Sequence, residues 1–262
     1  MKTPRNAVII GSGNLAEALA RAIAASGLEL RQLFARNEER ARTIASLAGC
    51  PRASHPGELC TTADIYLIAV SDAAVGEVAR TLPIPATAVV AHTAGSVPLE
   101  ALPERFPHRA VFYPMQTFTR GRAVDFREIP IFVEAADADT QTAVEEFAAH
   151  LSRTVLQADS ARRARVHLAA VFACNFANRM YALGERIVQD AGLEFGILKP
   201  LIAETARKAC DAASPADVQT GPAARHDTPT LARHEALLAG DPTLQELYKQ
   251  ISQNIWETSR KR

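Results

Sequence analysis

The chain has 262 residues, a length that suits one large domain or two modest ones. It carries 29 Lys and Arg against 29 Asp and Glu, so it lacks the basic excess typical of a free-standing nucleic-acid-binding protein. Hydrophobic residues make up 48% and charged residues 22%, which argues against disorder, and the apolar runs are too short to span a bilayer. The 4 cysteines and 7 histidines show no spacing typical of a metal site. We therefore expect a cytoplasmic protein with reduced thiols, no signal peptide, and no metal, nucleic-acid or membrane partner.

Short β-type runs alternate with helical patterns in the first part of the chain. The first run, Ala7–Ile10, leads into a helical stripe over Asn14–Ser26, which ends at Gly27. Further strands are predicted at Leu30–Ala35, Ile65–Val70, Thr87–Ala91, Ala110–Tyr113, Ile131–Glu134 and Thr154–Gln157. Near-continuous apolar strands that alternate with helices indicate an α/β fold, a Rossmann-type, doubly wound and mainly parallel sheet covered on both faces.

The strand patterns end at Asp159, and helical periodicity follows. The first helical stretch, Ala161–Ala191, would form a rod of about 45 Å if unbroken. Further helices are predicted at Phe195–Ala213, Thr228–Leu238 and Pro242–Trp256. The sequence therefore predicts a nucleotide-binding domain over residues 1–158 and an all-helical domain for substrate binding and dimerisation over residues 159–262.

A glycine-rich turn links the first strand to the first helix. It reads Gly11-Ser12-Gly13-Asn14-Leu15-Ala16, which is the GxGxxA pattern of dinucleotide-binding turns in its strand–turn–helix setting. Gly11 permits the tight turn, Gly13 lets the backbone approach a pyrophosphate, and Ala16 allows the helix to pack closely on the strand. The pyrophosphate would lie over N–H groups at the start of the helix. We therefore expect Gly11, Ser12, Gly13, Asn14 and Leu15 to bind a dinucleotide.

The end of the second predicted strand indicates which dinucleotide is bound. An NAD site has an acidic residue there to bind the ribose hydroxyls, but this strand ends in Arg36 and Asn37. Arg36 can bind a 2′-phosphate through two hydrogen bonds, and Arg40 lies one helical turn further on. Both arginines could instead be solvated charges, with Asn37 capping the next helix, and Glu38 and Glu39 follow closely. The missing acid and the placed arginine favour NADP(H) over NAD(H).

Two further strand ends face the same crevice, because ligands gather at the carboxyl ends of strands in open α/β sheets. Val70 and Ser71 follow one strand and can line a ribose, although Ser71 can also cap a helix. His92, Thr93 and Ser96 follow the next strand. We expect Thr93 to contact the cofactor and Ser96 the substrate.

The segment His92–Leu102 resembles the loop and following helix of the pyrroline-5-carboxylate reductases, and Phe112–Thr117 stands in the place of their MPN segment. The stretch from Pro200 to Asp227 is placed like their substrate-binding loop. The chain departs from these reductases where their amino-acid substrate would lie, because Gln116-Thr117 replaces their Pro-Asn.

More closely, the chain resembles a family of NADP oxidoreductases in which a Rossmann-like domain precedes a helical domain of unknown function. The features that carry this resemblance are the HTAGS loop, the PMQTF segment, the HLAAVFACNFAN helix and the TGPAARHD loop. The wider group includes 6-phosphogluconate dehydrogenase-like proteins. The resemblance implies NADP(H) as cofactor and a homodimer in which the second subunit completes the site.

Polar side chains interrupt the long apolar helix that follows the last predicted strand. His167, Cys174 and Asn178 point in one direction at about 100° per residue, and Asn175 lies beside them. Asn175 and Asn178 are about one turn apart and could hold one carbonyl or carboxamide group. Hydride transfer needs a proton donor, for which His92 and His167 are the candidates. Either histidine could instead be a core or interface residue bonded to the backbone.

The C-terminal loop adds polar groups to the expected site. Arg225 could bind a substrate carboxylate and Thr220 could donate to it, or Arg225 and Asp227 could form a loop salt bridge. The expected catalytic residues are His92, His167 and Asn175. The expected substrate contacts are Ser96, Gln116, Asn178, Thr220 and Arg225.

We therefore expect an NADP(H)-dependent oxidoreductase that transfers a hydride to or from a small carbonyl or imine compound, as the pyrroline-5-carboxylate reductases do. One alternative is an NADP-binding sensor without turnover. The other is a deazaflavin-dependent NADP reductase, although such enzymes normally lack a large C-terminal helical domain.

Overall fold

The computed structural model describes residues 1–260. The chain divides into two compact units, one over Met1–Ala177 and one that starts at Asn178. The last strand ends at Gln157, next to the boundary expected at residue 158, while the helix that follows belongs to the first compact unit. The limits of the functional domains therefore stay a prediction.

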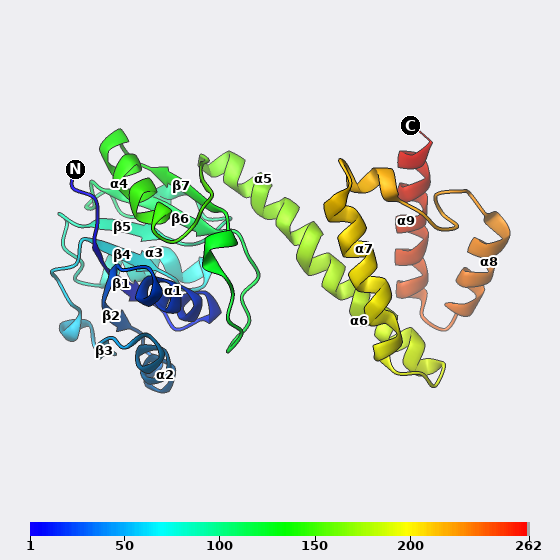
Figure 1. Ribbon diagram of the computed structural model, residues 1–262, viewed down its shortest axis with the longest axis horizontal. Coiled ribbons are helices and arrows are strands. Elements are labelled where there is room, and N and C mark those ends of the chain that lie inside the picture. The colour runs from blue at the N-terminus through cyan, green and yellow to red at the C-terminus, as the bar shows by residue number, and fades with distance from the viewer. Residues whose placement is uncertain (261–262) are drawn as a thin grey trace. The chain divides into compact units, whose positions relative to one another are not determined.

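Within residues 1–260, the first unit contains one eight-stranded sheet of order β3-β2-β1-β4-β5-β6-β7-β8 (Figure 1). The strands are β1 (Asn6–Ile10), β2 (Glu29–Phe34), β3 (Arg52–Ala53), β4 (Ile65–Ile68), β5 (Val89–His92), β6 (Arg109–Pro114), β7 (Ile131–Ala135) and β8 (Val155–Gln157). Neighbouring strands pair in parallel except β6 and β7, which are antiparallel. The predicted α/β, mainly parallel fold is confirmed. The sequence pattern missed β3, whose two residues are too few to show a period.

Helices cover both faces of this sheet, because its strands carry apolar side chains on both sides. One face packs against α1 (Asn14–Ala25), α2 (Glu38–Ala48) and α4 (Ala138–Ala149). The other packs against α3 (Val75–Thr81) and the apolar residues of the segment 94–106. The strand order reverses direction between β1 and β4, and open α/β sheets bind ligands at such a switch point.

The long helix expected over 161–191 is helical as far as Asp190 but not regular. α5 (Ser160–Ala170) is followed by a π-helical turn over Val171–Phe176 and then by α6 (Ala177–Asp190). A π-turn widens the helix locally, so the residues beyond it are rotated from their α-helical positions. The regular spacing assumed for His167, Cys174 and Asn178 therefore does not hold across this turn.

The second unit is helical, as the sequence predicts. It contains the body of α6 together with α7 (Lys199–Asp211), α8 (Thr228–Leu237) and α9 (Pro242–Ser259). Aspartates cap two of these helices: Asp227 accepts from the Thr230 N–H at 3.2 Å, and Asp241 accepts from the Leu244 N–H at 3.0 Å. Across residues 1–260, no helix combines the length and hydrophobicity that crossing a membrane requires.

Candidate functional site

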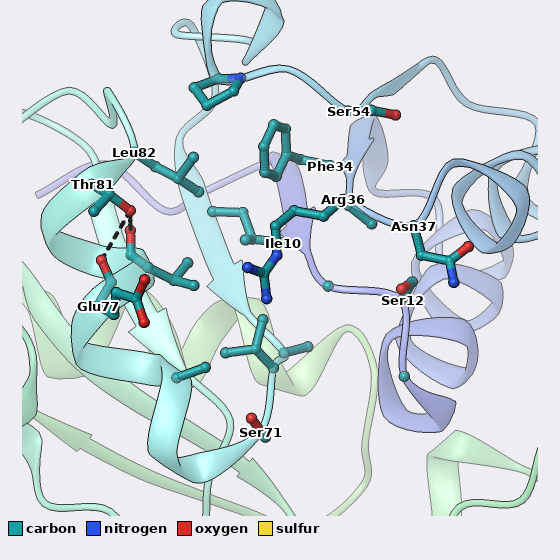
Figure 2. Close-up of a pocket in the computed structure, with 18 of the residues that line it drawn as sticks. Ile10, Ser12, Phe34, Arg36, Asn37, Ser54, Ser71, Glu77, Thr81 and Leu82 are labelled. Atoms are coloured by element: carbon teal, nitrogen blue, oxygen red, sulfur yellow. Dashed lines mark hydrogen bonds between the residues drawn. The ribbon is translucent and has the colours of Figure 1, made fainter.

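A cavity of about 760 Å³ lies at the carboxyl ends of β1, β2 and β4, where the strand order reverses (Figure 2). The expected nucleotide-binding residues that line it are Gly11, Ser12, Gly13, Asn14, Leu15, Arg36, Asn37, Val70 and Ser71. Thr93 does not line this cavity. It is buried, and its hydroxyl donates to the Ile68 carbonyl oxygen at 3.3 Å.

The β1–α1 turn has the geometry that a pyrophosphate needs. Gly11 has a φ of 135°, and a Cβ there would lie 2.1 Å from the Ala69 carbonyl oxygen, so only glycine fits. At Gly13 a Cβ would meet nothing within 4 Å, which leaves the approach to the backbone open. Gly13 is also the N-cap of α1 and places no side chain over the first N–H groups of the helix. Those N–H groups and the helix dipole fit an anionic group at this end of the cavity.

Arg36 provides a cation on the other side of the cavity. It follows the end of β2, and Figure 2 shows its side chain reaching into the cavity between the β1–α1 turn and the helix that carries Glu77 and Thr81. Among the described residues its guanidinium has no hydrogen-bond or ion-pair partner. Asn37 caps α2 by accepting from the Arg40 N–H at 3.0 Å. The cavity therefore offers a free guanidinium where a dinucleotide ribose would lie, which suits a 2′-phosphate.

Arg40, the second arginine of the predicted phosphate site, is turned away from the cavity. Its guanidinium donates to the Glu17 carboxylate at 2.9 Å and to the Ser12 carbonyl oxygen at 3.3 Å. Arg21 and the Gly121 N–H also donate to Glu17, each at 3.3 Å. Burial raises the pKa of the Glu17 carboxyl, but the hydrogen bonds from Arg40 and Arg21 outweigh this, so the pKa lies below its ordinary value. Arg40 is therefore committed to an ion pair beneath the turn.

Further residues line the cavity without any sequence signal. Ser54, His55 and Pro56 follow the short β3, and Glu77 and Thr81 come from α3. The Thr81 hydroxyl donates back to the Glu77 carbonyl oxygen at 3.0 Å (Figure 2). These residues belong to no motif, and only the folded chain brings them to the cavity.

A second cavity, of about 400 Å³, lies between the end of β6 and the helix formed by α5 and the π-turn. Three of the expected site residues line it, namely Gln116, His167 and Asn175. Tyr113 lines it as well, although the sequence predicts only that it ends a strand and belongs to the Phe112–Thr117 segment. Its hydroxyl lies 3.1 Å from His167 Nδ1, and the two rings meet edge to face. Burial raises the pKa of Tyr113, and the negative charge of Asp72 raises it further, so the phenol stays protonated at neutral pH.

Gly95 holds the backbone close to this pair. A Cβ there would lie 2.7 Å from His167 Nδ1 and 2.8 Å from the Tyr113 ring, so a larger residue would displace both side chains. Ser96, the next residue, is exposed, and its hydroxyl donates to the Asp72 carboxylate. The loop after β5 therefore lies directly against the tyrosine–histidine pair of the second cavity.

His92, one of the two predicted proton donors, lines neither cavity. It is 0% exposed, Nδ1 accepts from the Ala94 N–H, and Nε2 lies 3.3 Å from the Pro98 carbonyl oxygen. Burial, followed by the positive charge of Arg163, lowers the pKa of His92 to about 4. This arrangement is that of a neutral core histidine bonded to the backbone, which the sequence left open as the alternative.

The remaining predicted substrate contacts, Asn178, Thr220 and Arg225, lie in the second unit and are exposed. Asp227, the possible partner of Arg225, instead caps α8. The roles expected for these three residues stay predictions.

Two family models match the chain in succession. The first, described as coenzyme F420-dependent NADP oxidoreductase, matches residues 6–95, and the second, a domain of unknown function (DUF2520), matches residues 129–255. The comparison with curated proteins gives no match.

A solved protein from Bacteroides fragilis, named as an inferred NADP oxidoreductase, is 38% identical to this chain. The match covers 97% of this chain and 98% of the other, with a TM-score of 0.87. This chain belongs to the same family of NADP oxidoreductases.

More distant structures share the fold of this NADP oxidoreductase. A Thermotoga maritima protein is 22% identical, with 97% of this chain and 98% of the other covered and a TM-score of 0.73. A pyrroline-5-carboxylate reductase from Coxiella burnetii is 14% identical, with 99% and 98% covered and a TM-score of 0.57. At such identities the likeness concerns the fold alone. Membership of the family confirms the predicted oxidoreductase class with an NAD(P)-type cofactor.

Proposed function

We propose that this oxidoreductase uses NADP(H) to transfer a hydride to or from a small carbonyl or imine compound, in the manner of the pyrroline-5-carboxylate reductases. The observation that carries the choice of nucleotide is Arg36, an unpaired guanidinium in the cavity where an NAD site would have an acid. Gly11 to Leu15 would hold the pyrophosphate on backbone N–H groups, while Val70 and Ser71 would line a ribose.

When bound, the nicotinamide supplies or accepts the hydride. In the reducing direction the hydride adds to the substrate carbon, the π electrons of C=O or C=N move to the heteroatom, and that atom takes a proton. His167 is the proton donor in this proposal, because it lines the second cavity and its other ring nitrogen is held by Tyr113. His92, buried and neutral, keeps a structural part.

Tyr113 acts on His167 as a positioning residue. Because its pKa is raised, the phenol oxygen stays neutral and can accept from Nδ1–H of a protonated His167. The proton on Nε2 is then the one given to the substrate, and the neutral ring that remains still donates Nδ1–H to Tyr113. Asn175 and Gln116 would orient the substrate from the rim of the same cavity.

The dimer also belongs to this proposal. The helix that follows β8 exposes 62% of Phe172, 56% of Leu168 and 47% of Phe176, a cluster of large apolar side chains that a second subunit would cover. Light scattering at micromolar concentration should give twice the chain mass, and a monomer would refute this part. The cytoplasmic location stays a prediction.

The deazaflavin-dependent alternative has one observation in its favour, the F420-dependent family model over residues 6–95. That match covers the nucleotide turn and ends before Tyr113, Gln116 and His167. It therefore supports the nucleotide cavity and says nothing of a deazaflavin beside it.

The test is a fluorescence titration with NADPH and, separately, with NADH, on the wild type and on Arg36→Ala. Charge-assisted hydrogen bonds are worth about 1.5–3 kcal/mol, so Arg36→Ala should weaken NADPH binding by about tenfold or more and leave NADH binding unchanged. Arg42→Ala is the matched control, because Arg42 is an exposed arginine on α2 that does not line the cavity. Equal binding of both nucleotides by the wild type would remove the NADP preference, and no binding of either would overturn the proposal.

A further inference from the structure

We infer that the second cavity takes an uncharged, mainly apolar carbonyl or imine compound and selects against substrates that carry a carboxylate. This inference rests on the proposed function, since it assigns the substrate class of that reaction. It differs from what the resemblance to the pyrroline-5-carboxylate reductases implies, because their substrate is an amino-acid derivative.

The lining of the cavity is the first observation. Half of it is apolar, and the helix contributes small side chains that leave room for a hydrocarbon body. The apolar lining residues are Met115, Val166, Ala169, Ala170, Val171 and Ala173. At about 400 Å³ the cavity suits a small organic molecule.

The second observation concerns positive charge. Within the part of the chain that the structure describes, no lysine or arginine lines the cavity. The nearby Arg163 is 1% exposed, and both of its terminal nitrogens are engaged: Nη1 pairs with the Glu134 carboxylate, and Nη2 donates to the Val97 carbonyl oxygen and to Ser160 Oγ. Its Nε is buried and has no hydrogen-bond partner among the described residues. Because it is buried and both terminal nitrogens are engaged, Arg163 cannot offer two hydrogen bonds to a substrate carboxylate. A carboxylate moved into such a place would lose its hydration without gaining a lysine or arginine as a partner.

The negative charge of Asp72, near Tyr113, further disfavours an anionic substrate. This charge raises the pKa of Tyr113 more than the positive charge of Arg163 lowers it, and the Asp72 carboxylate accepts from the Ser96 hydroxyl. An anionic substrate beside Tyr113 and His167 would be repelled by it, whereas a neutral one would not.

The polar groups that remain suit a single neutral acceptor. The Gln116 side-chain oxygen accepts from the Thr117 N–H at 2.8 Å and from the Thr117 hydroxyl at 3.3 Å, so its NH₂ group is left to donate. Asn175, His167 and the Tyr113 hydroxyl are the other donors on the lining, beside the weakly donating thiol of Cys174. These groups can orient one carbonyl or imine atom. The one positive charge among them is that of protonated His167, which is lost with the transferred proton, so no permanent cation remains on the lining to neutralise a carboxylate.

The experiment uses matched pairs that differ by one carboxylate: cyclohexanone with 4-oxocyclohexanecarboxylate, and 1-pyrroline with 1-pyrroline-5-carboxylate. Binding to the full-length protein saturated with NADP⁺ is measured by ligand-observed NMR, and turnover is measured as NADPH oxidation. The uncharged member of each pair should bind and turn over at least tenfold better.

A variant tests the same idea by adding the missing cation. Ala169→Arg places a guanidinium on an exposed position of the lining. It should reduce the difference in affinity between the uncharged and the carboxylate member of each pair at least tenfold. Ala164→Arg, also exposed on α5 but outside the cavity, should leave this difference unchanged. Equal or better binding of the carboxylates by the wild type would overturn the inference. Binding of NADPH without binding of either member of any pair would also overturn the inference, but it would not contradict the proposed use of NADP(H). Failure to bind NADPH overturns both.

Discussion

Acidification below neutral pH should destabilise the first unit through His92. Its ring is 0% exposed, with Nδ1 accepting from the Ala94 N–H and Nε2 facing the Pro98 carbonyl oxygen, each at 3.3 Å. A backbone N–H only donates and a carbonyl only accepts, so both bonds need the neutral ring with its proton on Nε2. A proton on Nδ1 breaks one bond and places a second cation near Arg163.

The size of the effect follows from the pKa. The folded protein lowers the pKa of His92 from 6.5 to about 4, and unfolding restores the ordinary value. Below pH 6.5 the unfolded chain therefore binds a proton that the folded chain does not, and the free energy of unfolding falls as the pH falls. This contribution is fully present above pH 6.5 and lost near pH 4. At 1.36 kcal/mol for each pKa unit, it amounts to about 3 kcal/mol.

Urea unfolding at pH 7, 6, 5 and 4, followed by circular dichroism, measures this on the wild type and on His92→Gln. The variant should be less stable at pH 7 by about 1–3 kcal/mol, because buried backbone groups lose partners. The wild type alone should lose about 3 kcal/mol through His92 on going to pH 4, so the variant should there be as stable as the wild type or more stable. His55→Gln, a change at an exposed histidine, is the control and should follow the wild type. Hydrogen exchange in Val89–His92 localises the effect. The reasoning would be refuted if the difference in free energy of unfolding between the wild type and His92→Gln were the same at every pH.

Three further predictions concern the two cavities. Gly11→Ala should lower the melting temperature and abolish NADPH binding, because the new Cβ would lie 2.1 Å from a carbonyl oxygen. Gly13→Ala should weaken NADPH binding and leave the melting temperature unchanged, because its Cβ would meet nothing within 4 Å. Gly95→Ala should destabilise the fold by about 1–3 kcal/mol in urea unfolding and reduce kcat by separating the tyrosine–histidine pair, with NADPH affinity kept. Glu17→Gln should lower the free energy of unfolding at pH 7 but not at acidic pH. The lowered pKa of Glu17 stabilises the fold above the ordinary pKa of a carboxyl, and this contribution is lost once the carboxyl of the folded protein is protonated. An equal loss of stability at both pH values would contradict this prediction.

The nucleotide turn was predictable because its determinants are local. Gly11, Gly13 and the strand and helix around them lie in one short stretch, and the hydrophobic period changes where the turn begins. Arg36 was predictable for the same reason, since its place at the end of a strand is a sequence property. The sheet was predictable from the alternation of strands and helices. The antiparallel direction of β7 was not, because its apolar pattern does not differ from that of a parallel strand.

The second cavity depends on contacts that sequence spacing does not encode. Tyr113 and His167 are 54 positions apart, and the strand pattern explains Tyr113 fully as a β-type aromatic. His92 shows the opposite case: its position after a strand suggested chemistry, and only burial and two backbone bonds reveal a structural histidine. The π-turn at Val171–Phe176 likewise has no Pro or Gly to announce it, so the regular helical period misplaced the polar residues beyond it.

The charges around the nucleotide turn explain why we expect one arginine to decide the proposed preference for NADP(H). Glu17 lies in the first turn of α1, where its negative charge would oppose a pyrophosphate at the same helix end. Arg40 and Arg21 pair with this carboxylate, and Arg40 also binds the Ser12 carbonyl oxygen, so both cations serve to neutralise and hold the turn. The sequence predicts Arg40 as a second phosphate ligand, but its charge is already balanced by Glu17. Arg36 alone among the cavity-lining residues keeps an unbalanced positive charge, so its removal should shift the preference without disturbing the turn.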